Sequence, residues 1–516
     1  MTLALVLAAG ALAAGLRDLA VFFAATTTFI VGMLLLDFAA DVYQRASRLI
    51  AEPTRLLRAL VGPWFGLMLA ATLLLALPLA TDSAVPDYRH NFWLHVLNSA
   101  YAAVSAACLV GTTTYSVGEE YSLFGQVVLL VATQLAGMGL AAVGLAVIRP
   151  FLAHAIRLRT VLLMSVVLQI LAIPAMWGSW HAVDAAASWD RFWWGAFHAS
   201  NALWNSGLTL RATGLAAYFS SGAVFMTITT LAIVGSLGLP IILDLLVDIR
   251  ASLGRGRSDL RTRPEAGAGR APWRRLPQWE AGAAFVLLIA TATLLFFLET
   301  PWRSDIVWRL PDEWVPARPF DLGPEHVSFR DDMSHSARWT TGVFVSATLR
   351  SAGLQSIPLS QGAVSWPSYG LVLANMLVGG SAGGVSGGLR TSCLLILGLC
   401  LVVRRRTWMQ TPGGPAVRGT LIRGMIVLLA AWLALNAVGV LAFAATTDGT
   451  AYDLVLDSMA ACNSVGLSTG LSLHLTATGR LVIIALMLAG RIVPTVCWAR
   501  VARSVAESAR RIGDIT

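Results

Sequence analysis

The chain has 516 residues, of which 56% are apolar and only 13% are charged. An ordinary soluble domain carries about 25% charged residues, so this composition excludes a cytosolic enzyme, a secreted disulfide domain and a disordered chain. It predicts an all-α membrane protein that crosses the bilayer several times. The net charge is +9 and all 37 basic residues are arginines. In a membrane protein this excess indicates cytoplasmic loops rather than nucleic-acid binding.

Apolar runs recur along the chain, with the roughly 20 residues that one membrane crossing needs. They lie at 20–38, 59–80, 123–148, 160–178, 222–247, 280–298, 368–402, 420–445 and 478–499. Arginines cluster at 45–58, 149–159, 250–275, 404–423 and 500–511. The positive-inside rule places these five regions in the cytoplasm. The long loop 300–337 is then extracellular.

Four shorter, semi-apolar segments stand between these runs, at 92–111, 190–207, 338–353 and 452–466. Each is too short or too polar to span comfortably, which is typical of surface loops or re-entrant half-helices. The order helix, short segment, helix therefore occurs four times and predicts four repeats around one pore. We expect extra N-terminal helices at 1–50, repeats at 51–150, 151–248, 278–406 and 407–516, and a basic linker at 249–277.

Each short segment ends in a glycine that follows a small residue or asparagine by six positions. A half-helix entering from outside points its partly negative C-terminal end at the membrane centre, which favours a cation. The extended backbone after it can replace the hydration shell of a large monovalent cation with carbonyls. One such glycine alone is typical of a helix C-cap, but four equivalent copies favour a selectivity filter. Its expected residues are Val110, Gly111, Thr112, Ser206, Gly207, Leu208, Ala352, Gly353, Leu354, Val465, Gly466 and Leu467.

A glycine-rich stretch at 379–388 interrupts an otherwise apolar run. Because each helical glycine costs up to about 1 kcal/mol, we expect this stretch to leave the helix. It fits a flexible gate below the filter, whereas close packing of small residues between helices is the alternative. Glycine density favours the gate. Its expected residues are Gly379, Gly380, Ser381, Gly383, Gly384, Ser386, Gly387, Gly388 and, from the last spanning run, Arg491.

Three of the charged residues in or beside predicted membrane segments are candidates for a function. Arg491 lies within a spanning run, where a charge is costly and indicates function; projection toward the pore competes with snorkelling or pairing with an acid. Arg350 lies in the third short segment and could pair with an acid behind the filter. Asp457 lies near the expected start of the fourth short helix, where it could cap the helix or attract cations.

In order, these segments resemble motifs of the Trk, Ktr and plant HKT family of potassium-uptake transporters. The four glycine segments are similar to the family's four filters, 379–391 to its intramembrane loop, and Gly490-Arg491-Ile492-Val493-Pro494 to its arginine motif. The resemblance implies a multi-pass inner-membrane subunit that takes up K⁺ and forms a homodimer. It implies separate cytoplasmic nucleotide-binding (RCK-type) regulatory subunits. The N-terminal helices resemble those of the Trk branch.

The chain departs from this family at three places. The first filter reads Val110-Gly111-Thr112 where the family usually has Thr-Gly-Leu, Arg390 replaces lysine at the end of the loop, and Asp457 replaces glutamate. In the family, serine in place of the first filter glycine accompanies Na⁺ transport, so Gly111 favours K⁺. Na⁺ transport, unselective K⁺/Na⁺ transport and a non-conducting scaffold or sensor remain alternatives.

The sequence contains no P-loop, HExxH or GxSxG motif, so we expect neither an enzyme nor a covalently bound cofactor. The expected ion is the transported K⁺ at the filter. The basic linker has two interpretations, a loop facing anionic lipids or a docking surface for the regulatory ring.

Overall fold

The computed structural model describes residues 53–81, 91–149, 152, 154–177, 188–211, 214–215, 222–253, 276–299, 335–350, 352–356, 359, 364–402 and 414–513. The expected N-terminal helices at 1–50 lie outside these residues, as do most of the basic linker 249–277 and nearly all of the extracellular insertion 300–337. The described part of the chain is helical and contains only isolated β-bridges, Thr81 to Tyr121 and Val378 to Leu389.

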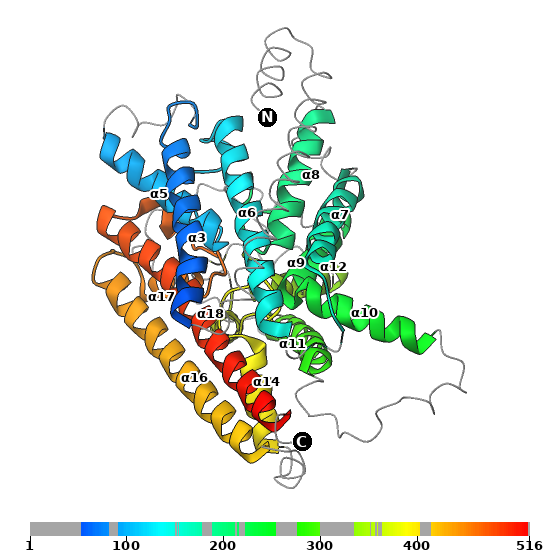
Figure 1. The fold of residues 1–516 in the computed structure, drawn as a ribbon. Coiled ribbons are helices and arrows are strands. Elements are labelled where there is room, and N and C mark those ends of the chain that lie inside the picture. The colour runs from blue at the N-terminus through cyan, green and yellow to red at the C-terminus, as the bar shows by residue number, and fades with distance from the viewer. Residues whose placement is uncertain are drawn as a thin grey trace.

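The described elements follow the expected order of long and short helices (Figure 1). They are α3 (Pro53–Leu75), α5 (Phe92–Cys108), α6 (Leu123–Ile148), α7 (Leu158–Trp177), α8 (Ser188–Leu203), α9 (Gly222–Leu237), α10 (Leu239–Leu253), α11 (Leu276–Glu299), α12 (His335–Thr348), α13 (Trp366–Leu377), α14 (Thr391–Val402), α16 (Gly414–Ala444), α17 (Ala451–Cys462), the 3₁₀ helix η7 (Leu471–His474) and α18 (Ala477–Gly513).

Five of the described helices are long and apolar enough to cross a membrane, namely α6, α7, α11, α16 and α18. Their outward faces carry large apolar side chains, such as Leu171, Phe285 and Leu441. Such apolar faces would favour aggregation in water, whereas they are suited to contact with the lipid of a membrane. The chain is therefore an all-α protein that passes through the membrane several times.

The expected apolar run at 222–247 forms two helices rather than one straight helix, because the chain bends by 93° between α9 and α10. Gly238 sits at the bend with φ +90°, and a side chain there would overlap the backbone of Gly383 and Gly384. Pro240 stands in the first turn of α10, where its missing N–H costs no helical hydrogen bond. Figure 1 shows α10 extending away from the centre of the bundle.

A histidine contact ties α10 to the segment that follows α6. The backbone N–H of His154 donates to Asp244 Oδ1 at 2.8 Å, and the ring Nδ1 lies 3.0 Å from the same oxygen. The other ring nitrogen lies 3.9 Å from Asp248 Oδ1. The two nitrogens face different carboxylates of α10, so the histidine ties the segment that follows α6 to this helix.

The short helices α5, α8 and α17 each pack between the two flanking helices of their own repeat, and α12 packs against α11. Each also contacts the helix that leaves the preceding repeat, in the pairs α8 with α6, α12 with α9 and α17 with α13. The contact of α5 with α18 completes this pattern, since it joins the first repeat to the fourth. The four repeats therefore close into a ring, with the C-terminal ends of the short helices at its centre.

Candidate ion filter and intramembrane loop

The short helices end in nearly the same backbone turn. In the first, second and fourth segments, the N–H of the residue before the glycine donates to the carbonyl five residues back: Val110 to Ser105 at 2.9 Å, Ser206 to Asn201 at 2.9 Å and Val465 to Ala460 at 2.8 Å. In the third segment the corresponding bond is shifted by one residue and joins Gly353 to Thr348 at 3.2 Å. Such bonds satisfy carbonyls that a helix end leaves free.

In two of the segments, the residue six positions before the glycine uses its side chain to stabilise this turn. The Ser105 hydroxyl accepts a hydrogen bond from the N–H of Gly111 at 3.0 Å. The Asn201 side chain accepts one from the hydroxyl of Ser206. In these two segments the pattern therefore reflects a helix end that is reinforced by its own side chain, whereas Ala347 and Ala460 stand at the same position in the other two.

The glycine of each segment has the left-handed backbone that glycine adopts most easily. The φ angles are +97° at Gly111, +74° at Gly207, +58° at Gly353 and +82° at Gly466. We call these four residues the filter ring. Any other residue type at these positions would be strained.

The filter ring closes on itself through backbone contacts. A Cβ atom added to Gly207 would lie 3.0 Å from the carbonyl oxygens of Ala352 and Val110. One added to Gly111 would overlap the Ser206–Gly207 backbone, one on Gly353 would overlap Val465, and one on Gly466 would overlap Val110. Each glycine thus touches the carbonyl that precedes a neighbouring glycine. Four carbonyls from equivalent positions meet here, which is the arrangement that can replace the water around a desolvated cation.

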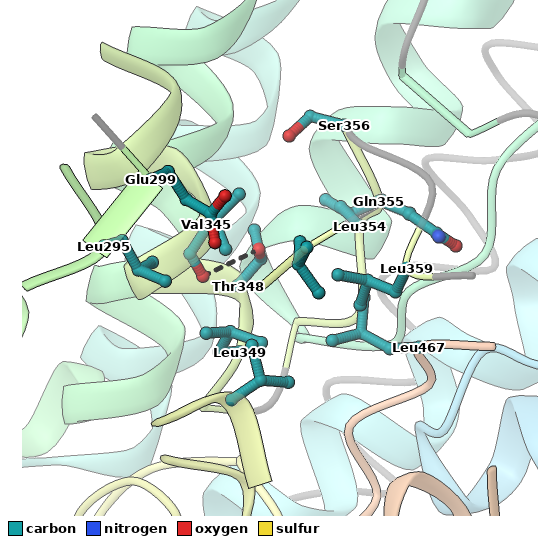
Figure 2. Close-up of a pocket in the computed structure, with 12 residues that line it drawn as sticks. Leu295, Glu299, Val345, Thr348, Leu349, Leu354, Gln355, Ser356, Leu359 and Leu467 are labelled. Atoms are coloured by element: carbon teal, nitrogen blue, oxygen red, sulfur yellow. Dashed lines mark hydrogen bonds between the residues drawn. The ribbon is translucent and has the colours of Figure 1, made fainter. Parts of the chain in front are cut away.

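The remaining predicted filter residues support this ring from the side. Thr112 lies 3.2 Å from the hydroxyl of Tyr101. Leu208, Leu354 and Leu467 are buried. Leu354 and Leu467 line a mostly apolar pocket, drawn in Figure 2, together with Leu349 and the third short helix.

The one acid in this pocket, Glu299, has a structural partner. Its carboxylate accepts hydrogen bonds from the N–H of Ser365 at 2.9 Å and from its hydroxyl at 2.7 Å. Ser365 is the N-cap of α13. Glu299 therefore joins the end of α11 to the start of α13 and leaves the pocket without an acid free for a cation.

Asp457 does not lie at the start of the fourth short helix, so the expected capping role is wrong. The helix α17 begins at Ala451, where Thr450 is the N-cap and Asp453 supplies the acid of the first turn. Asp457 is buried farther along α17 and accepts hydrogen bonds from the Ser468 hydroxyl at 3.1 Å and the Thr469 N–H at 3.0 Å. It holds the chain that leaves the fourth filter segment.

The glycine-rich stretch leaves the helix, as expected. Residues 378–390, the intramembrane loop, connect α13 to α14. Its two ends pair, since Gly379 N–H donates to Leu389 O at 2.9 Å and Leu389 N–H donates to Leu377 O at 3.2 Å. A side chain on Gly387 would lie 2.5 Å from Ser464 Cβ, so the loop packs directly against the fourth filter segment.

The bend between α9 and α10 supplies hydrogen-bond acceptors to this loop. The N–H of Ser381 donates to Ser236 O at 3.0 Å, and the Ser381 hydroxyl donates to Leu237 O at 2.5 Å. The N–H of Val385 donates to Gly235 O at 3.2 Å. These carbonyls belong to the last turn of α9 and have no continuing helix to bond. The bend and the loop therefore stabilise each other.

Arg491 joins the loop to the first filter segment. Its guanidinium donates to Cys108 O at 2.5 Å, to Leu109 O at 3.2 Å and to Val385 O at 2.6 Å. The side chain is only 2% exposed. All three acceptors are backbone carbonyls inside the protein. Arg491 therefore does not snorkel to the interface, and none of these hydrogen bonds involves an acid.

Two further buried arginines hold the loop by its carbonyls. Arg350 donates to Gly379 O at 3.2 Å and to Ala284 O at 3.5 Å. These partners are carbonyls of the loop and of α11, so the expected pairing with an acid behind the filter is wrong. Arg390 donates to Ser381 O and Gly384 O, both at 3.0 Å.

Residues 153–505 match the protein family described as "TrkH: Cation transport protein". The chain belongs to this family. It is a membrane subunit of the Trk/Ktr potassium-transporter group and is a transporter rather than an enzyme.

Curated relatives and a solved structure agree with this assignment. "Ktr system potassium uptake protein B" of Vibrio alginolyticus is 22% identical over 476 residues, which cover 85% of this chain and 89% of the relative. "Potassium/sodium uptake protein NtpJ" of Enterococcus hirae is 23% identical over 426 residues, which cover 77% and 83%. The crystal structure of the potassium transporter TrkH from Vibrio parahaemolyticus has the same fold, with a TM-score of 0.57, 16% identity and coverage of 90% and 96%.

Sequence reasoning missed two groups of buried polar residues near this TrkH-family site. Gln134 of α6 bonds to Gln169, Ser200 and the indole N–H of Trp204, and so supports the second filter segment from behind. Glu280 of α11 faces the intramembrane loop. Glu280 could have been singled out from the sequence, because an acidic residue within an apolar run indicates a functional site.

Proposed function

We propose that this TrkH-family subunit takes up K⁺ across the cytoplasmic membrane, through the filter ring. The observation that carries the proposal is the closed contact of four equivalent glycines, each against a backbone carbonyl of a neighbouring segment. Carbonyl coordination without a fixed acid suits a weakly hydrated monovalent cation better than Ca²⁺ or Mg²⁺, which require more highly charged oxygen ligands.

The intramembrane loop and Arg491 act as the gate in this proposal. The loop lies against the fourth filter segment, and Arg491 binds it to the first. Opening requires that the loop leave this position. Two features support a mobile role: the loop has little regular secondary structure, and its backbone is held at several points by side chains that can change partner.

The proposed partner proteins are those expected for a member of this family. We infer that the protein forms a homodimer and that separate cytoplasmic nucleotide-binding regulatory subunits control the gate. The α10 helix offers a route for that control, since its first turn meets the loop at Gly238 and its far end leads into the basic linker.

Transport of Na⁺, or of K⁺ and Na⁺ without strong preference, is the second candidate. The relative named as a potassium/sodium uptake protein favours it, as does the unusual first filter sequence Val110-Gly111-Thr112. A non-conducting scaffold or sensor is the third.

Ion flux into proteoliposomes separates these candidates. We would measure Rb⁺ uptake by the wild type and by Gly111→Ser, each with K⁺ or Na⁺ as competitor. Gly139→Ser is the matched control, because a side chain at Gly139 in α6 meets no atom within 4 Å. Uptake that K⁺ blocks better than Na⁺, with this preference reduced only by Gly111→Ser, supports K⁺ transport. Equal competition supports the second candidate, and no uptake by folded protein supports the third.

A further inference from the structure

Three buried arginines surround the intramembrane loop, and each donates to its carbonyls. They are Arg350, Arg390 and Arg491, and their exposed fractions are 5%, 7% and 2%. Arg390 and Arg491 are close enough for each to act on the charge of the other. Positive charges inside a low-dielectric region repel one another and also repel a cation that passes below the filter. The loop therefore needs a negative charge nearby.

Glu280 is placed to supply that charge. It lies in α11, one helical turn before Ala284, whose carbonyl accepts from Arg350. Its side chain is completely buried, and neither carboxylate oxygen makes a hydrogen bond of good geometry. A buried carboxylate without hydrogen bonds is costly unless an opposite charge compensates it.

The groups that face this carboxylate belong to the loop and to the first turn of α14. The guanidinium of Arg390 interacts with it electrostatically. The hydroxyls of Ser381 and Ser392 also lie beside it. Ser381 and Ser392 also bond the loop internally, since Ser392 accepts from the N–H of Ala382 at 3.0 Å and Ser381 accepts from that of Gly383 at 3.2 Å.

We propose that Glu280 is a positioning residue of the ion path below the filter: its negative charge compensates that of Arg390 and so lowers the positive barrier that a passing cation meets. Arg390 carries its positive charge into the intramembrane loop, where it donates to Ser381 O and Gly384 O next to the residue whose carbonyl binds Arg491. This inference rests on the proposed transport function and assigns a residue to its ion path. It requires that Glu280 be ionised, because a neutral carboxyl group would not compensate Arg390.

A charge-balance cycle tests the proposal on the full chain in proteoliposomes. Glu280→Gln keeps the shape of the side chain and removes its charge, so we expect Rb⁺ uptake to fall about tenfold as the positive barrier rises. Glu280→Asp keeps the charge and should keep uptake within about threefold of wild type. Arg390→Gln in the Glu280→Gln background removes the uncompensated positive charge and should restore most of the uptake.

Glu299→Gln is the matched control, since it neutralises a buried acid at the other end of the same helix. We expect it to have the same effect on uptake in the wild-type background and in the Arg390→Gln background. A Glu280→Gln variant that transports like the wild type would overturn the proposal, as would a Glu280→Gln/Arg390→Gln variant no better than Glu280→Gln. If the wild type itself shows no uptake, the proposed transport function is wrong. The pairing of Glu280 with Arg390 is then tested by comparing the thermal stability of the same variants.

The yield of folded protein provides a second test if Glu280→Gln does not fold. The double variant should then be recovered as folded protein where the single variant is not, because it contains no uncompensated arginine. Equal failure of both variants to fold, with wild type and Glu299→Gln folded, would contradict the pairing of Glu280 with Arg390.

Discussion

Arg491 of the last helix donates a hydrogen bond of 2.6 Å to the backbone carbonyl of Val385, at the middle of the intramembrane loop. The same guanidinium binds the two carbonyls that end the first short helix. One side chain therefore connects the first repeat, the third and the fourth directly below the filter. A charged hydrogen bond in such a dry position contributes about 1.5–3 kcal/mol, which is enough to bias a loop between two positions.

Replacing Arg491 by glutamine should release this connection. We expect Rb⁺ uptake in the absence of any regulatory subunit to rise about tenfold, since the loss of about 1.4 kcal/mol from the closed state shifts its population by that factor. Arg418→Gln is the control, because Arg418 makes the same type of contact to Cys400 O at 2.7 and 2.9 Å away from the loop. Lower uptake by folded Arg491→Gln would show that the arginine favours the open state.

Asp457→Ala should loosen the chain that leaves the fourth filter segment. The Ser468 hydroxyl and the Thr469 N–H would lose their acceptor inside the protein, which costs about 1–3 kcal/mol. We expect a lower melting temperature and a smaller preference for K⁺ over Na⁺ in competition assays. Asp453→Ala removes an acid from the first turn of the same helix and should lower stability without changing ion preference. Equal loss of preference in both variants would contradict a specific role for Asp457.

Gly238→Ala should disturb the gate through the bend in the second repeat. The left-handed backbone at this position costs an alanine about 1–2 kcal/mol, and the new methyl group would overlap Gly383 and Gly384. We expect the loop to move and uptake without a regulator to change at least about threefold, beyond the change in melting temperature. Gly282→Ala in α11, where the added atom meets nothing within 4 Å, should leave both unchanged. Wild-type uptake by Gly238→Ala would show that the bend is not coupled to the loop.

Gln134→Leu should weaken the second filter segment from behind. The substitution leaves the indole N–H of Trp204 and the amide of Gln169 without their shared partner. Each orphaned group costs about 1–3 kcal/mol, so the free energy of unfolding should fall by at least that amount in denaturant titrations. Gln126→Leu, which affects a partly buried contact to Trp193 near the start of α6, should have a smaller effect.

Local patterns predicted much of this architecture, and tertiary contacts determined the rest. The four glycines followed from a repeated helix end, and the loop followed from glycine density, because both depend on nearby residues. The bend at Gly238 depends on the distant loop that fills it, although Gly238 with Pro240 two residues later was a usable local signal. The partners of Arg350 and Asp457 come from other segments, and no spacing in the chain indicates them.

The central claim is that four equivalent glycines form one filter, and bi-ionic flux measurements on single Gly→Ala variants test it most directly. We would replace Gly111, Gly207, Gly353 and Gly466 one at a time and measure the K⁺/Na⁺ permeability ratio in proteoliposomes, with Gly139→Ala as the control. The account predicts that the wild type prefers K⁺, that all four substitutions lower the ratio or abolish flux in folded protein, and that the control matches the wild type. Wild-type ratios in two or more of the four variants would contradict a ring to which all four segments contribute.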